Sequence, residues 1–149
     1  MMKKSILIAL SILVLIPFLS ISSSNDADKI VGKWQVGSGK AHILIYKYGD
    51  KYAGKIAWLK EPLNEKGQPK VDKNNPDPSK RNNPLLGNVN MLGFEYDGNK
   101  SWSEGTIYDS ENGKTYSCNI KMPDDNTLEV RGYIGISMIG RTDTWKRVK

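Results

Sequence analysis

The fold is decided by residues 87–134, which read GNVNMLGFEYDGNKSWSEGTIYDSENGKTYSCNIKMPDDNTLEVRGYI. Four runs rich in aromatic and β-branched residues are separated here by three turn sequences: Asp97-Gly98, Glu111-Asn112-Gly113 and Pro123-Asp124-Asp125-Asn126. Asp-Gly and Asn-Gly tolerate the positive φ angles of tight hairpins, so these connections favour antiparallel neighbours. The stretch therefore predicts four consecutive strands, at 87–96, 100–108, 114–121 and 126–134.

The same pattern continues on both sides of this stretch. Candidate strands lie at 30–36, 40–48 and 51–59 before it and at 138–148 after it, with turns at Gly37-Ser38-Gly39 and Gly49-Asp50. No long apolar set recurs at helical spacing. A domain made of eight strands is typical of a closed barrel, in which no strand edge is left bare. We therefore predict an all-β fold, a single eight-stranded antiparallel barrel.

One segment, 60–86, cannot be a strand, because it contains five prolines and each removes a ladder donor. We expect a long Pro-rich loop after the third strand, ordered in its proline-dense part at 72–84. Its Asp and Asn oxygens suggest calcium, but the glycine and the terminal glutamate of an EF-hand are missing. We predict no metal site and a structural or lid motif formed by Asp72, Asn74, Asn75, Pro76, Asp77 and Pro78.

The N-terminus has the order of a secretory signal. Lys3 and Lys4 precede an uncharged apolar run at 5–21, and small residues follow at 22–24. The run is short for a bilayer span, although an uncleaved anchor is the alternative. We expect a signal peptide at 1–24 and a barrel domain at 25–149, periplasmic or secreted and not membrane-spanning after cleavage.

Strand alternation, with charges placed in water, divides inside from outside. Lys47 outward would turn the even-numbered residues of 42–48 inward and leave Ala41, Ile43 and Ile45 as an apolar outer strip. An eight-stranded barrel either fills with side chains or holds one small ligand, and both interpretations fit the inward aromatics and glycines. The candidate ligand-binding residues of the interior are His42, Tyr46, Ile56, Trp58, Phe94, Tyr116 and Ile134.

Catalysis is disfavoured by the residues available. His42 is the only histidine and has apolar neighbours on its strand, and Cys118 is predicted to be a buried, inert thiol. No Gly-x-Ser-x-Gly elbow and no phosphate-binding glycine loop occur in the sequence. The net charge of +6 comes from basic residues spread along the chain, which argues against nucleic-acid binding. We predict no cofactor and no enzymatic activity.

The first and last predicted strands contain motifs that resemble those of a known class of barrel. Gly32-Lys33-Trp34 begins the first strand, and Trp145-Lys146-Arg147 ends the last. A Gly-x-Trp with an arginine on the final strand resembles the barrel closure of lipocalins. That resemblance implies an arginine packed over the tryptophan, and it assigns Gly32, Trp34, Trp145 and Arg147 to closure.

Further motifs make the resemblance more specific. With 144–148, the stretches 72–78, 84–87, 113–116 and 131–135 resemble, in order, a family of small exported bacterial proteins of unassigned function with a lipocalin-like barrel. The resemblance implies a fold and a compartment but no reaction.

Two functions remain open at this point. The first is an exported, non-enzymatic protein that carries a small hydrophobic or amphipathic ligand in the barrel. The second is a cell-envelope module with a filled barrel, which docks a protein partner through its long loop or its apolar outer strip.

Overall fold

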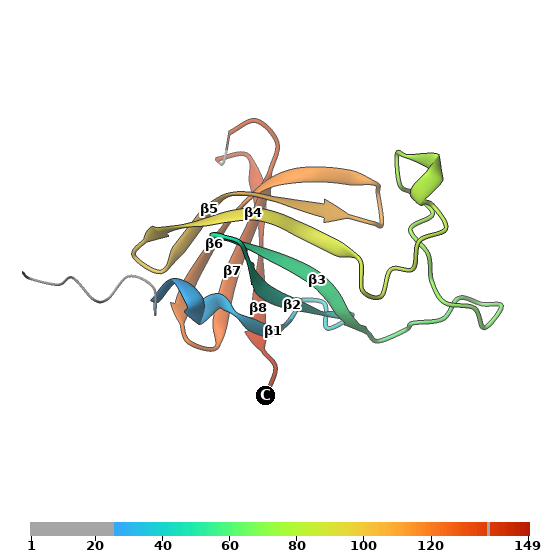
Figure 1. Cartoon of the computed structure of the whole chain (residues 1–149), viewed down its shortest axis with the longest axis horizontal. Helices are drawn as coiled ribbons and strands as arrows, with labels where there is room; N and C mark the ends of the chain where they lie inside the picture. The colour runs from blue at the N-terminus through green and yellow to red at the C-terminus, as the bar shows by residue number, and fades with distance from the viewer. Residues whose placement is uncertain (1–25, 137) are drawn as a thin grey trace, which may run out of the picture.

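Short strands joined by tight turns close into a barrel in the computed structural model, which describes residues 26–136 and 138–149 (Figure 1). Every strand pairs antiparallel with its chain neighbour, and the first pairs with the last. The predicted all-β, eight-stranded barrel is therefore confirmed. The strands are β1 (Gly32–Gln35), β2 (Ala41–Tyr48), β3 (Lys51–Leu59), β4 (Val89–Gly98), β5 (Ser101–Asp109), β6 (Lys114–Asp124), β7 (Thr127–Tyr133) and β8 (Gly140–Arg147).

Helical structure within the described residues is limited to short segments. The short 3-10 helices are η1 (Asp28–Ile30) and η2 (Pro78–Lys80). Within the described ranges, no helix has the length and apolar character that crossing a membrane requires. The predicted signal peptide, 1–24, lies outside the described residues.

Barrel closure depends on a stack between the first and last strands. Trp34 of β1 pairs with Arg147 of β8, and the guanidinium carbon lies 4.1 Å from the indole centroid. The guanidinium also donates hydrogen bonds to the carbonyl oxygens of Asp125 (2.7 Å), Val31 (3.0 Å) and Lys29 (2.6 Å). Cation–π attraction and three charge-assisted bonds thus join three chain segments at one end of the barrel.

Gly32 makes this arrangement possible. A Cβ at Gly32 would lie 2.7 Å from a terminal nitrogen of Arg147, and the φ of 138° is one that L side chains rarely adopt. The indole nitrogen of Trp34 donates to the carbonyl of Ile30 at 2.8 Å, which ties the strand to η1. The Gly-x-Trp pattern therefore supplies both the space and the stacking surface.

The same end of the barrel is closed by η1. Ile30 is fully buried, the Tyr52 hydroxyl donates to the Asp28 carboxylate, and the Trp102 indole donates to the Ala27 carbonyl at 3.2 Å. Burial and the bond to Asp28 raise the pKa of Tyr52, so this phenol stays protonated as a donor. Large side chains fill this half of the interior: Trp34, Trp102, Phe94, Ile45, Ile120, Met122 and Leu128.

The predicted orientation of β2 is wrong. Ile43 and Ile45 are each only 2 % exposed and belong to the core, so the outer apolar strip of Ala41, Ile43 and Ile45 does not exist. The error came from the assumption that a charged residue such as Lys47 must lie on the outer face of the barrel. Lys47 lies near the end of its strand, where its long side chain reaches Asp28 at 3.3 Å beside the closed end.

Local register shifts also turn Trp58 and Leu92 outward. Ile43 pairs with Ile56 but His42 pairs with Trp58, so Ala57 is an extra residue and the alternation of β3 changes there. Trp58 is 41 % exposed as a result. A second shift in the β3–β4 pairing, beside Gly93 with its φ of 77°, leaves Leu92 on the outer face.

The connection between β3 and β4 runs over the other end of the barrel, at the right of Figure 1. It contains η2 and two isolated bridges, Leu63 with Pro69 and Val71 with Pro84. Backbone bonds link its two arms, because Asp72 donates to Asn83 at 2.9 Å and Leu85 donates to Lys70 at 3.0 Å. These bonds give the connection a defined path.

Replacing the closure arginine tests the role of the stack. We expect Arg147→Ala to lower the free energy of unfolding by about 2–4 kcal/mol, because three carbonyl groups and the indole face lose their partner. Arg141→Ala, an exposed position of β8, is the matched control and should change it by less than about 0.5 kcal/mol. Urea denaturation followed by tryptophan fluorescence measures both, and equal effects would contradict the account.

Candidate ligand-binding site

A cavity lies at the end of the barrel opposite η1. It has a volume of about 1540 Å³, and it is surrounded by the β1–β2 turn, the β3–β4 connection, the β5–β6 turn and the β7–β8 connection. The end of the barrel near η1 is thus packed, and the opposite end opens into a cavity whose walls extend into these connections. The structure combines the two interpretations that the sequence left undecided.

The floor of the cavity is apolar. Ile43, Ile56, Val130 and Trp145 belong to the buried core and also line the cavity. Ile107 is partly buried and lies among them. Burial of an apolar group against such a surface is favourable in proportion to the area removed from water.

A few polar groups face this apolar surface. Asn90 lines the cavity, and its Oδ1 is the one buried side-chain polar atom among the described residues without a hydrogen-bond partner. The Tyr116 hydroxyl, by contrast, accepts a bond from Asn112 Nδ2 at 2.9 Å. A buried carbonyl oxygen without a donor is costly, so Asn90 marks a place where an N–H or O–H group would be stabilised.

Trp145 contributes to the cavity rather than to the closure stack. Its indole nitrogen donates to Asp143 Oδ2 at 2.7 Å, and the same oxygen accepts a bond from the Gly37 backbone at 3.1 Å. This carboxylate therefore holds the β1–β2 turn against β8 at the mouth of the cavity. Of the four residues that the sequence assigns to barrel closure, Gly32, Trp34 and Arg147 form the contact between the first and last strands.

A buried carboxylate attaches the β3–β4 connection to the barrel. Asp72 is only 2 % exposed; its Oδ1 accepts a bond from the Tyr108 hydroxyl of β5 and its Oδ2 one from Asn75 Nδ2, both at 2.7 Å. Burial and the bond to Asp72 raise the pKa of Tyr108 to about 12. Tyr108 therefore remains a hydrogen-bond donor at neutral pH.

Asn74 makes a second attachment on the β5–β6 turn. Its Nδ2 donates to the carbonyl oxygens of Ser110 (3.1 Å) and Glu111 (2.9 Å). A Cβ at Gly113 would lie only 2.1 Å from the Asn74 carbonyl oxygen, so the approach of the two backbones requires glycine there. The connection is therefore fixed at two adjacent points of one hairpin.

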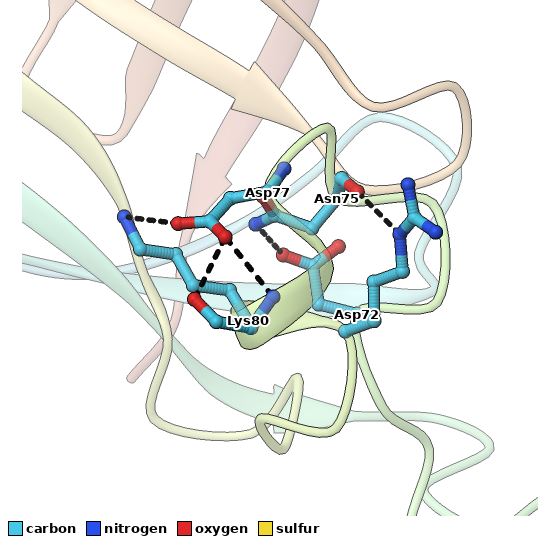
Figure 2. Close-up of polar contacts among 6 residues, drawn as sticks. Asp72, Asn75, Asp77 and Lys80 are labelled. Atoms are coloured by element: carbon cyan, nitrogen blue, oxygen red, sulfur yellow. Dashed lines mark hydrogen bonds and ion pairs between the residues drawn. The ribbon is translucent and has the colours of Figure 1, made fainter.

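The remaining polar residues of the motif stabilise turns (Figure 2). Asp77 accepts bonds from the Ser79 backbone (3.0 Å) and hydroxyl (2.7 Å), which caps η2, and Asn75 accepts one from the Asp77 backbone. Arg81 Nε donates to the Asn75 carbonyl at 2.8 Å. Pro76 and Pro78 flank Asp77, and Pro78 begins η2. Across residues 26–136 and 138–149, no group of three or more His, Cys, Asp or Glu residues could hold a metal ion.

The predicted interior residues fall into three groups. Ile56, Tyr116 and Ile134 line the cavity. Phe94 is inside the barrel but belongs to the packed core and does not line the cavity. His42, Tyr46 and Trp58 lie on the outer face, so their assignment to the interior is wrong.

The outward residues contact one another. The His42 and Trp58 rings stack with centroids 4.3 Å apart, and Lys55 Nζ lies 5.8 Å from the Tyr46 ring centroid. Burial and the nearby Lys33 lower the pKa of His42, so this imidazole is neutral at pH 7. Cys118 is fully buried, and burial raises the pKa of its thiol to about 12.

Sequence analysis missed several cavity residues. The alternation pattern places Ile43 on the wrong face and does not define the faces of the strand that holds Ile107, and the closure motif assigns Trp145 to closure alone. Asn90 and Tyr108 gave no signal of their own, because an isolated polar residue in a strand is normally placed on the solvent side. Both side chains line the cavity, which becomes visible only once β5 is paired with β4 and β6.

The closed barrel, its Trp34–Arg147 stack and its open cavity together define a lipocalin-like barrel. Among solved structures the chain is similar to protein HP1028 from the human pathogen Helicobacter pylori, which is described as belonging to the lipocalin family. The two are 25 % identical, the match covers 80 % of this chain and 82 % of that chain, and the TM-score is 0.70.

A family model identifies the chain more closely. Residues 32–147 match the model described as "Uncharacterized protein conserved in bacteria (DUF2147)", and the protein belongs to that family. The resemblance noted from the sequence, to a bacterial family with a lipocalin-like barrel, is thereby confirmed. A search among curated proteins found no match.

Removing one hydroxyl tests the attachment of the β3–β4 connection. Tyr108→Phe takes a donor from the buried Asp72 carboxylate, so we expect a loss of about 1–3 kcal/mol in the free energy of unfolding. Trypsin should then cut faster at Lys73, Lys80 and Arg81 in the native protein. Tyr48→Phe, an exposed tyrosine at the closed end, is the matched control.

The pH dependence of this effect has a definite sign. Because the pKa of Tyr108 is raised from 10.0 to about 12, its contribution is complete below pH 10 and is lost as the pH rises toward 12. Cleavage rates that are equal in the variant and the wild type at pH 8 would show that Asp72 does not hold the connection in place.

Proposed function

We propose that this protein is an exported, non-enzymatic binding protein that carries a small amphipathic ligand in the open half of its barrel. The observation that carries the proposal is the 1540 Å³ cavity with its apolar floor. Cavities of several hundred Å³ or more that combine apolar walls with a few polar groups are the usual sites for small molecules.

Asn90 supports an amphipathic rather than a purely hydrocarbon ligand. Its unpartnered Oδ1 lies beside apolar residues, so a ligand with an N–H or O–H group would satisfy this oxygen while its apolar part covers the floor. The similarity to a solved protein of the lipocalin family agrees with this use of the barrel. The identity of the ligand is left to experiment.

A non-enzymatic role agrees with the state of the two reactive side chains. His42 is stacked on Trp58 on the outer face, away from the cavity. With a pKa of about 12, the Cys118 thiol is protonated at neutral pH and is not a nucleophile. Export to the periplasm or cell exterior rests on the basic and apolar order of residues 1–24.

A second candidate function is the docking of an envelope protein. The outer face of β2 and β3 displays Trp58 and Tyr48, with the half-buried His42, Leu44 and Tyr46 between them. Aromatic side chains are enriched in protein interfaces, and the β3–β4 connection offers a second surface. Deleting 66–82 separates the two functions: loss of a partner with intact ligand binding would favour docking.

The carrier proposal predicts which variants affect binding of the fluorescent apolar amine N-phenyl-1-naphthylamine. Ile107→Gln places a polar group on the cavity floor and should weaken probe binding by about tenfold, since less apolar surface is buried. Trp58→Gln changes a larger apolar side chain on the outer face and should leave the affinity within about twofold. Fluorescence titration measures both.

Two outcomes would contradict the proposal. The first is a wild-type protein that does not bind the probe. The second is a probe affinity that falls in Trp58→Gln and not in Ile107→Gln, which would place the binding site on the outer aromatic face.

A further inference from the structure

The connection between β7 and β8 exposes a cluster of apolar side chains, which we call the apolar tip. Its members are Ile134 (65 % exposed), Ile136 (60 %), Met138 (85 %) and Ile139 (71 %). The connection projects from the barrel at the top of Figure 1. Isolated exposed aliphatic residues are common, but a contiguous group on one short connection indicates an interaction surface.

Polar contacts hold the tip in this conformation. Arg131 of β7 donates to the Met138 carbonyl at 3.2 Å and to the Thr142 hydroxyl at 2.9 Å, and the Ile139 backbone donates to the Ile136 carbonyl at 3.1 Å. These bonds fix the backbone without burying the aliphatic side chains. The connection is therefore folded in a way that keeps its apolar side chains in water.

The charge of this segment favours an anionic partner. Between Glu129 and Asp143 the chain has no acidic residue and two arginines, Arg131 and Arg141, on the strands that flank the tip. The carboxylate that follows, Asp143, accepts bonds from the neutral N–H groups of Trp145 and Gly37 and keeps its charge, so residues 130–143 have a net charge of +1. Without Lys3 and Lys4 of the predicted signal peptide, the 20 remaining basic and 16 acidic residues give a net charge of +4. Exposed aliphatic residues flanked by arginines match the combination that binds anionic lipid surfaces.

The tip also lies at the mouth of the cavity. Ile134, Ile139 and Arg141 line the cavity, whereas Ile136 and Met138 do not. A membrane contacted by Ile136 and Met138 would therefore face the opening of the barrel. An amphipathic ligand could pass between the bilayer and the cavity with little apolar surface crossing water.

We propose that the apolar tip inserts shallowly into the surface of an anionic phospholipid bilayer and sets the cavity mouth against it. Binding to the bilayer stands on the exposed residues and the flanking arginines alone. Its use for ligand exchange rests on the proposed carrier function. The other possible occupants, a second copy of the chain or a protein partner, become outcomes of the test.

The test is flotation of the purified protein with vesicles of phosphatidylglycerol and phosphatidylethanolamine, compared with vesicles of phosphatidylcholine. The wild type should float with the anionic vesicles, less so as salt rises, because screening weakens the arginine contribution. The double variant Ile136→Ser, Met138→Ser should bind at least about tenfold more weakly, because it loses the inserting side chains.

Leu92→Ser is the matched control, since Leu92 is 50 % exposed on the outer face of β4, away from the tip. It should bind vesicles as the wild type does. Both variants should keep the circular dichroism, the mass in solution and the affinity for N-phenyl-1-naphthylamine of the wild type, because none of the three positions lines the cavity.

Three results would overturn the membrane proposal. The first is a wild type that does not bind vesicles, and the second is a double variant that binds them as well as the wild type does. The third is a wild type that forms a dimer and binds no vesicles, together with a double variant that is a monomer. The carrier proposal fails independently: vesicle binding without probe binding would overturn the carrier alone, and probe binding without vesicle binding would overturn the membrane contact alone.

Discussion

The packing of the Arg147 guanidinium on the Trp34 indole is the constraint on which the rest of the structure depends. It joins the last strand to the first, and its three carbonyl acceptors tie η1 and the β6–β7 turn to the same point. Trp34, Trp102 and Phe94 fill the closed end of the barrel interior and do not line the cavity at the other end. The cavity is thus a consequence of where the barrel concentrates its large side chains.

The open end is organised by polar bonds instead of apolar packing. Asp72 and Asn74 attach the β3–β4 connection to β5 and to the β5–β6 turn, and Asp143 of β8 holds the β1–β2 turn. These bonds leave the apolar floor uncovered. This arrangement suits the proposed binding function, because the packed end supplies stability while polar bonds hold the open end in shape. The exposed tip at Ile136 and Met138 lies at that same open end.

The fold could be predicted because turns and closure residues are local signals: Asp-Gly, Asn-Gly and Gly-x-Trp each require a particular backbone geometry. The interior was harder to predict. One lysine near a strand end, Lys47, reversed the faces of β2, and an extra residue at Ala57 moved Trp58 outside. Register shifts depend on contacts between strands, so alternation within one strand cannot reveal them. For the same reason Asn90 and Tyr108 became recognisable only in the assembled barrel.

The central claim is that the open half of the barrel holds a small amphipathic molecule. Native mass spectrometry of protein isolated under gentle conditions, before and after organic extraction, tests it most directly. The account predicts a discrete additional mass that extraction removes, with the same compound recovered in the organic phase. The mass of the bare polypeptide in both samples, with nothing recovered, would contradict it.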